Sequence, residues 1–114
     1  MKNNAKIAAL AAALLTIAAT AAQAAEAQDN WTQNCAACHG PDGTGHTKAG
    51  RMAQVKDMTN PDYQKTFTDD QAAAQIKGGL KDKDGKERMK SFGDVFSDSD
   101  INALVTYVRS LQKK

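Results

Sequence analysis

An all-α fold, built from three or four short helices joined by long loops, is the fold class that the sequence predicts. One observation is a stripe of apolar residues at helical spacing near the C-terminus, and a second is that no segment shows the sustained alternation expected of a strand. The third is a shortage of large apolar residues. Loops this long are therefore expected to wrap around a buried group in addition to protein side chains.

The first quarter of the chain has the pattern of an export signal. Lys2 and Lys6 precede an alanine-rich apolar run, which ends at a small-x-small tripeptide at positions 22–24, the pattern that signal peptidases cleave. We therefore expect residues 1–24 to be a cleaved signal peptide and residues 25–114 to form a single domain. The expected location of that domain is the periplasm.

Two alternatives stay open at this end of the chain. A second small-x-small tripeptide would place cleavage after Ala27 instead of Ala24. The other alternative is a retained membrane anchor. Thr16 and Thr20 interrupt the apolar run, however, which is short of the ~20 strongly apolar residues that a spanning helix prefers. After cleavage we expect no stable insertion into a membrane.

The predicted domain has no net charge and a small apolar content. Of the 15 basic residues in the chain, Lys2 and Lys6 lie in the signal, which leaves 13 against 13 acidic residues. No basic stripe interleaved with aromatic residues is left, so nucleic-acid binding is not expected. The domain contains only three leucines, two isoleucines, four valines and three phenylalanines. A large apolar cofactor would compensate for so small a core.

The start of the domain predicts one helix followed by a loop. Residues 29–38 contain neither glycine nor proline, and Trp31, Cys35 and Cys38 fall near one face of such a helix. Residues 40–50 hold four glycines and a proline, which interrupt regular structure. This stretch is therefore expected to be a loop.

Cap patterns mark the next elements. A turn is expected to begin at Asn60, just before a proline. Thr68 and Gln71 form a capping box for a short helix that runs to about Lys77 and stops at a pair of glycines. A charged loop over residues 81–90 is expected to follow.

The final helix has the clearest periodic pattern. Ser97 and Asp100 form an N-terminal cap, after which apolar residues recur at intervals of three and four positions. The stripe consists of Ile101, Leu104, Val105, Val108 and Leu111. This spacing predicts an amphipathic helix with one face on the core.

The only two cysteines of the chain lie in the motif Cys35-x-x-Cys38-His39. Cys-x-x-Cys-His is the attachment signature of c-type haem: the thiols add to the porphyrin vinyl groups, and a helical turn places the histidine beneath the iron as an axial ligand. A thioredoxin-like redox motif expects a preceding strand, and none is predicted. Zinc needs about four ligands, and only these three residues and His46 are available. The export signal favours haem again, because covalent haem attachment occurs outside the bacterial cytoplasm.

With its flanking segments, this motif resembles the class I monohaem c-type cytochromes, in particular small bacterial ones, over about residues 26–112. Trp31 sits four positions before Cys35, where family members usually carry an aromatic residue. The stretch "CHGPDGTG" resembles their post-haem loop, and "MKSFGDVFSDSDINALVTYVRSL" resembles their sixth-ligand loop and final helix. The resemblance implies a cytochrome c fold wrapped around one covalently bound haem c.

The resemblance also implies the residues of the site. It implies thioether bonds from Cys35 and Cys38, axial ligation of the iron by His39 and Met89, and one-electron transfer without substrate chemistry.

Two family prolines are absent from this sequence. Lys90 follows Met89, and Arg51 stands where a second proline is often found. The carbonyl of that second proline commonly accepts the N–H of the proximal histidine. Since the contact needs only a backbone oxygen, Gly50 or Arg51 is expected to provide it to His39.

For the second axial ligand, the sequence offers Met52, Met58, Met89 and His46. Most buried methionines fill core space and bind nothing. Met52 lies close in sequence to His39, Met58 resembles an apolar plug that packs on the haem, and His46 follows His39 in a tight loop. Met89 has about 50 residues of chain in which to reach the far side of the porphyrin. Met89 is therefore the expected ligand, with an open sixth position as the alternative.

The function expected from these residues is that of a periplasmic one-electron carrier and not of an enzyme. Its partners would be redox proteins, such as a membrane respiratory complex or a dehydrogenase on one side and an oxidase or reductase on the other, and the carrier is expected to be a monomer. One alternative is an open-site haem enzyme or a sensor of peroxide or a diatomic gas. Another is a dedicated haem subunit of one oxidoreductase.

Overall fold

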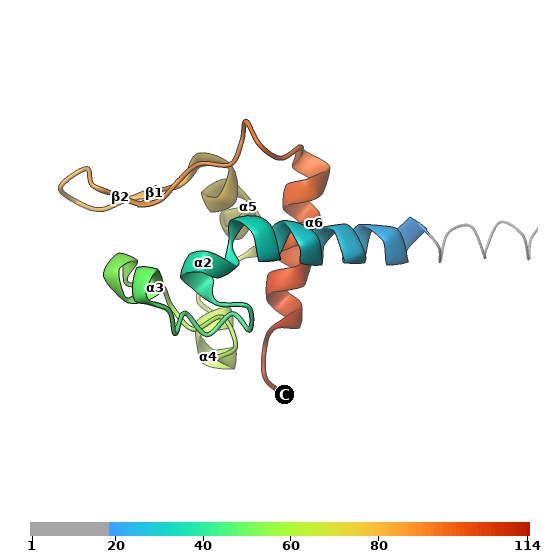
Figure 1. Ribbon diagram of the computed structural model, residues 1–114, viewed down its shortest axis with the longest axis horizontal. Helices are drawn as coiled ribbons and strands as arrows, with labels where there is room; N and C mark the ends of the chain where they lie inside the picture. Colours follow the sequence, from blue (N-terminus) through green and yellow to red (C-terminus); the bar gives the residue numbers. More distant parts are fainter. Residues whose placement is uncertain (1–18) are drawn as a thin grey trace, which may run out of the picture.

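The computed structural model describes residues 19–114, so that most of the predicted signal peptide, residues 1–18, lies outside the described residues. The first helix covers residues 19–34 and has no label in Figure 1. The labelled elements are α2 (Ala36–His39), α3 (Lys48–Ala53), α4 (Pro61–Gln64), α5 (Asp69–Gly78), β1 (Leu80–Lys81), β2 (Glu87–Met89) and α6 (Asp98–Ser110). Helices predominate in this part of the chain, which confirms the all-α class.

No helix within residues 19–114 combines the length and the apolar character needed to cross a membrane.

The helix predicted over residues 29–38 begins earlier and is interrupted near its end. It is already helical at residue 19, Cys35 lies in a turn, and α2 resumes the helix for a single turn. Gly40 then ends α2 with φ of 83°, in the region that favours glycine.

The predicted caps form as expected. The side chain of Thr68 accepts from the backbone N–H of Gln71, and the Gln71 side chain accepts from the N–H of Thr68, which opens α5. Ser97 and Asp100 make the same reciprocal pair at the start of α6. These contacts satisfy N–H groups that a helix start leaves without partners.

The charged segment over residues 81–90 is more regular than expected. It forms an antiparallel hairpin in which Leu80 pairs with Met89 and Lys81 with Glu87. The carboxylate of Asp82 closes the turn by accepting from the N–H groups of Asp84 and Lys86, each at 2.9 Å. Sequence alternation could not indicate these strands, because they are only two and three residues long.

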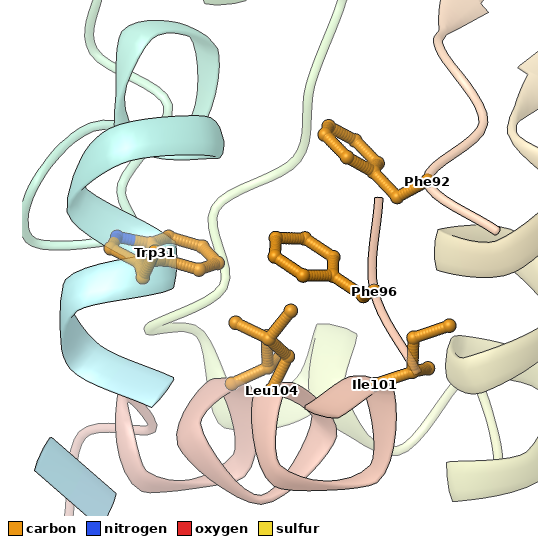
Figure 2. Packing of buried hydrophobic residues seen from close by; sticks show 6 residues of the cluster. Trp31, Phe92, Phe96, Ile101 and Leu104 are labelled. Atoms are coloured by element: carbon orange, nitrogen blue, oxygen red, sulfur yellow. The ribbon is translucent and has the colours of Figure 1, made fainter. Parts of the chain in front are cut away.

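The core lies where the first helix, α6 and the segment before α6 meet (Figure 2). Trp31 projects from the first helix toward Phe96 and Leu104, and Leu104 is fully buried. The buried cluster consists of Trp31, Phe92, Phe96, Ile101, Leu104 and Val108. The predicted apolar stripe of α6 therefore faces the core, and Leu111, half-buried beyond the end of the helix, packs against the same cluster.

Hydrogen bonds attach the middle of the chain to α6. The buried side chain of Gln64 donates to the carbonyl oxygens of Met58, at 2.7 Å, and of Val108, at 2.9 Å. Arg109 donates to the side-chain oxygen of Gln64 and to the carbonyl of Phe67. The loop that carries Met58 is therefore held against the end of α6.

Candidate functional site

The Cys-x-x-Cys-His motif lies at the junction of the first helix and α2. The N–H of Cys35 donates to the Trp31 carbonyl, and the N–H of His39 donates to the Cys35 carbonyl, both at 2.9 Å. One helical turn therefore separates Cys35 from His39, with Cys38 just before the histidine. All three side chains are half-buried.

Trp31 positions this turn from the side of the core. Its indole N–H donates to the carbonyl of Gly40 at 3.1 Å. Its ring centroid lies 5.5 Å from that of His39 and 5.4 Å from that of Tyr107 on α6. The contact with Tyr107 joins the first and last helices through aromatic packing.

The loop after the motif folds back on the second cysteine. The hydroxyl of Thr47 donates to the Cys38 carbonyl at 2.7 Å and accepts from the N–H of Gly50 at 2.8 Å. A Cβ at Gly50 would lie 2.3 Å from the same carbonyl oxygen, so only glycine fits there. The start of α3 is thus fixed to the motif through backbone contacts.

Burial controls the charge of His39. It lowers the pKa of the imidazole, because the charged form loses solvation, and the neutral ring is the form that binds a metal. The buried Nδ1 has no hydrogen-bond partner among the described residues. The expected contact with Gly50 or Arg51 is absent here. Those carbonyls instead accept from the N–H groups of Val55 and Gln54 at the end of α3.

The surroundings of Cys35 disfavour its thiolate form. Neither Cys35 nor Cys38 forms a disulfide. Burial, and secondarily the neighbouring Cys38, raise the pKa of Cys35 to about 11, whereas a redox-active thiol has a lowered pKa. No group of three or more histidine, cysteine, aspartate or glutamate side chains within residues 19–114 is placed to hold a metal ion. The raised pKa of Cys35 weighs against the thioredoxin-like alternative.

Met89, the expected second ligand, comes from the hairpin. It is the last residue of β2 and is half-buried. Its side chain packs against the buried cluster, and so does Cys35 from the motif. Its Sδ accepts a hydrogen bond from Nε2 of Gln75 on α5 at 3.8 Å. Lys90 also lies near the motif, because its charge offsets part of the rise in the pKa of the Cys35 thiol.

The other candidates have different surroundings. Met52 is 70% exposed on α3. His46 is exposed in the loop after the motif. Met58 packs against the buried cluster, but its N–H donates to the carbonyl of Gly43, so it belongs to the same loop system as the motif.

Two residues near Met89 were missed by sequence reasoning. Gln75 lies in an ordinary helical pattern, and Arg88 looks like one more charge in a charged segment. Their contacts with Met89 and with α3 join segments that are separate in the sequence. No local signal could have found them.

Two surface hollows lie away from this site. One, of about 310 Å³, lies between α5 and α6, beside the ion pair of Lys77 and Asp98. The other, of about 60 Å³, lies between the first helix and α6 near Ala27. Neither is lined by the cysteines, His39 or Met89.

The sequence profile of the cytochrome c family matches residues 24–112, so the chain belongs to the cytochrome c family. The fold and the site together define a monohaem c-type cytochrome that binds one covalent haem c and serves haem-based electron transfer. Domains of this family typically lie outside the cytoplasm, and they exchange electrons with redox partners.

Solved structures agree with this assignment. The chain is similar to the c-type cytochrome KustC0563, with 27% identity, a TM-score of 0.68, and coverage of 75% of this chain and 96% of that one. The chain is also similar to a Tyr-to-Phe mutant of Kustc0563, with 25% identity and a TM-score of 0.66. The match covers 76% of this chain and 99% of the mutant. No curated protein matches the sequence.

The residues present at the site fit a covalent haem. Cys35 and Cys38 are unpaired, and the thiol of Cys35 is held in its protonated form at neutral pH. His39 is a neutral imidazole with a buried nitrogen that has no partner in the described structure. The thioether of Met89 packs against the same cluster as Cys35.

Proposed function

We propose that this cytochrome is a periplasmic one-electron carrier whose haem is attached through Cys35 and Cys38 and ligated by His39 and Met89. The observation that carries the proposal is the convergence of Cys35 and Met89 on one buried cluster, although 54 positions separate them in the sequence. Each of the other three candidates is exposed or belongs to the loops that follow the motif.

The protein side chains have distinct tasks in this proposal. When bound, the haem supplies a reversible one-electron change at its iron. Trp31, Phe92 and Phe96 provide an apolar surrounding, which limits the reorganisation of charge around the site. His39 is kept neutral by burial and oriented by its contact with the Trp31 ring.

Ligation by Met89 also bears on the choice between a carrier and an enzyme. A thioether in the sixth position leaves no place for peroxide or a diatomic gas to bind the iron. The partners are then other redox proteins, which approach the surface without entering the site. Export of the chain through residues 1–24 accounts for covalent haem attachment, which takes place outside the bacterial cytoplasm.

The visible spectrum of the oxidised holoprotein tests the ligand assignment. We expect a weak sulfur-to-iron absorption in the red region, and we expect Met89→Ala to abolish it, to keep the haem covalently attached and to let carbon monoxide bind the reduced protein. Met52→Ala and Met58→Ala are the matched controls and should keep the absorption. Its persistence in Met89→Ala would move the ligand elsewhere, and rapid binding of carbon monoxide by the unmutated protein would favour the open-site alternative.

A further inference from the structure

Arg88, the neighbour of Met89 on β2, makes a contact that electron transfer by itself does not require. Its Nη1 donates to the carbonyl oxygen of Met52 on α3 at 3.2 Å. Its Nε and Nη2 both lie 3.1 Å from Oδ2 of Asp82, across the same hairpin. One guanidinium therefore joins the two strands of the hairpin to a helix that lies 36 positions earlier in the sequence.

This ion pair is better shielded than the others in the described structure. The side chains of Arg88 and Asp82 are 26% and 22% exposed, while each of the other three pairs has a partner that is at least 70% exposed. Shielded, charge-assisted hydrogen bonds are stronger than exposed ones. Asp82 is itself held in place by the N–H groups of Asp84 and Lys86.

Arg88 joins two segments that each bear on the site: α3, which is linked to the Cys-x-x-Cys-His motif, and the hairpin, which carries Met89. α3 is fixed to Cys38 through Thr47, whereas the hairpin carries Met89. Figure 1 shows the hairpin and α3 at the same end of the molecule. Among the described residues, the bond from Arg88 to Met52 is the hydrogen bond that connects the hairpin with the motif side of the site.

We propose that Arg88 is a positioning residue that clasps the Met89 hairpin to α3 and keeps the sixth ligand position closed to outside molecules. The proposal rests on the proposed ligation by Met89. Without the clasp, the hairpin is held mainly at its base, where Gln75 contacts Met89 and the N–H of Phe92 donates to Ile76. The free end is then released from α3, and only the contacts at the base keep Met89 in place.

The test compares holoprotein variants in two measurements. The first is the rate at which imidazole binds the oxidised protein, and the second is hydrogen exchange of the backbone amides in β1 and β2. Arg88→Gln should raise both rates roughly two- to fivefold, because the bond to Met52 is exposed and solvent screens the ion pair with Asp82. Arg51→Gln is the matched control, because it removes an exposed arginine from α3 and should change neither rate.

Two further variants separate geometry from charge. Arg88→Lys keeps the charge but lacks the fork that reaches Asp82 and Met52 together, so it should resemble Arg88→Gln. Asp82→Asn removes the ion pair and leaves the bond to Met52, so it should give a smaller increase. Full restoration by Arg88→Lys, or equal rates for Arg88→Gln and Arg51→Gln, would overturn the clasp.

Hydrogen exchange also separates the clasp from the ligand assignment. If the unmutated protein lacks the sulfur-to-iron absorption, ligation by Met89 fails. Faster exchange of the hairpin in Arg88→Gln would still support the clasp in that case, and unchanged exchange would overturn it.

Discussion

Single residues around the site show how burial decides their chemistry. The same loss of solvation acts on Cys35 and His39, raising the pKa of the thiol and lowering that of the imidazole. Both groups are therefore neutral near pH 7, and the neutral imidazole is the form that binds a metal. Gln75 has a weaker effect, and this effect is on the electron density of the Met89 sulfur, because the Gln75 amide donates a hydrogen bond to it.

Removal of that donor should lower the reduction potential. A hydrogen bond draws electron density from the sulfur, which disfavours ferric iron, so Gln75→Leu should stabilise the oxidised state. A net loss of about 0.5–1 kcal/mol corresponds to a decrease of about 20–45 mV for a one-electron couple. Spectroelectrochemical titration measures this shift. Gln75→Glu keeps the shape of the side chain but adds negative charge, so it should lower the potential further; an unchanged potential in both variants would contradict the role of Gln75.

Among the elements, the first helix and α6 pack against each other beside the site through Trp31 and Tyr107. Trp31 is 3% exposed and contacts both Tyr107 and His39. The capping boxes at Thr68 and Ser97 fix where α5 and α6 begin, and so fix which faces these helices present to the core.

Substitution of Trp31 tests this pairing. Trp31→Ala should reduce the free energy of unfolding of the holoprotein by about 3–5 kcal/mol, as expected for a large buried aromatic side chain. Trp31→Phe keeps much of the ring contact and loses the bond to Gly40, so it should cost only about 1 kcal/mol. Denaturant titration of both variants provides the comparison. Equal stability of Trp31→Ala and the unmutated protein would show that the indole is not part of the core.

The start of the first helix bears on the site of signal cleavage. Residues 19–26 are exposed, whereas Ala27 is 3% exposed. Cleavage after Ala24 would leave this buried contact intact, and cleavage after Ala27 would remove it. We therefore expect the mass of the exported protein to correspond to a chain that begins at Ala25. A chain that begins at Gln28 would show that the contact of Ala27 is dispensable.

At the scale of the whole molecule, the protein core is small for the loops that surround it. Eight apolar residues of the described chain are buried, and the motif, the hairpin and the loop carrying Met58 all converge on one cluster. A domain of this size with so few large apolar residues depends on an additional buried group for its stability. We therefore expect the haem to have a structural role as well as a redox role.

Deletion of residues 1–24 tests that dependence. The protein made without export should lack haem and should show no cooperative thermal unfolding, because the apolar core alone does not offset the conformational entropy of the chain. Circular dichroism during heating makes the measurement, with the exported holoprotein as the control. A cooperative transition in the haem-free protein would show that the core suffices by itself.

Local spacing determined what the sequence predicted correctly. The two capping boxes and the stripe of α6 each depend on residues one to four positions apart, which a helix brings together whatever the rest of the fold does. The haem motif has the same short spacing, and the roles of its residues stay a prediction. The family assignment follows from the same features, and the profile match over residues 24–112 confirms it.

Only the tertiary structure decided which distant segments meet. It exposes Met52, packs Met89 against the cluster that Cys35 also contacts, and pairs the charged segment before Met89 into a hairpin. It also brings Gln75 and Arg88 to partners 14 and 36 positions away. Such contacts depend on how distant segments of the chain pack together. The composition of a single segment does not specify that packing.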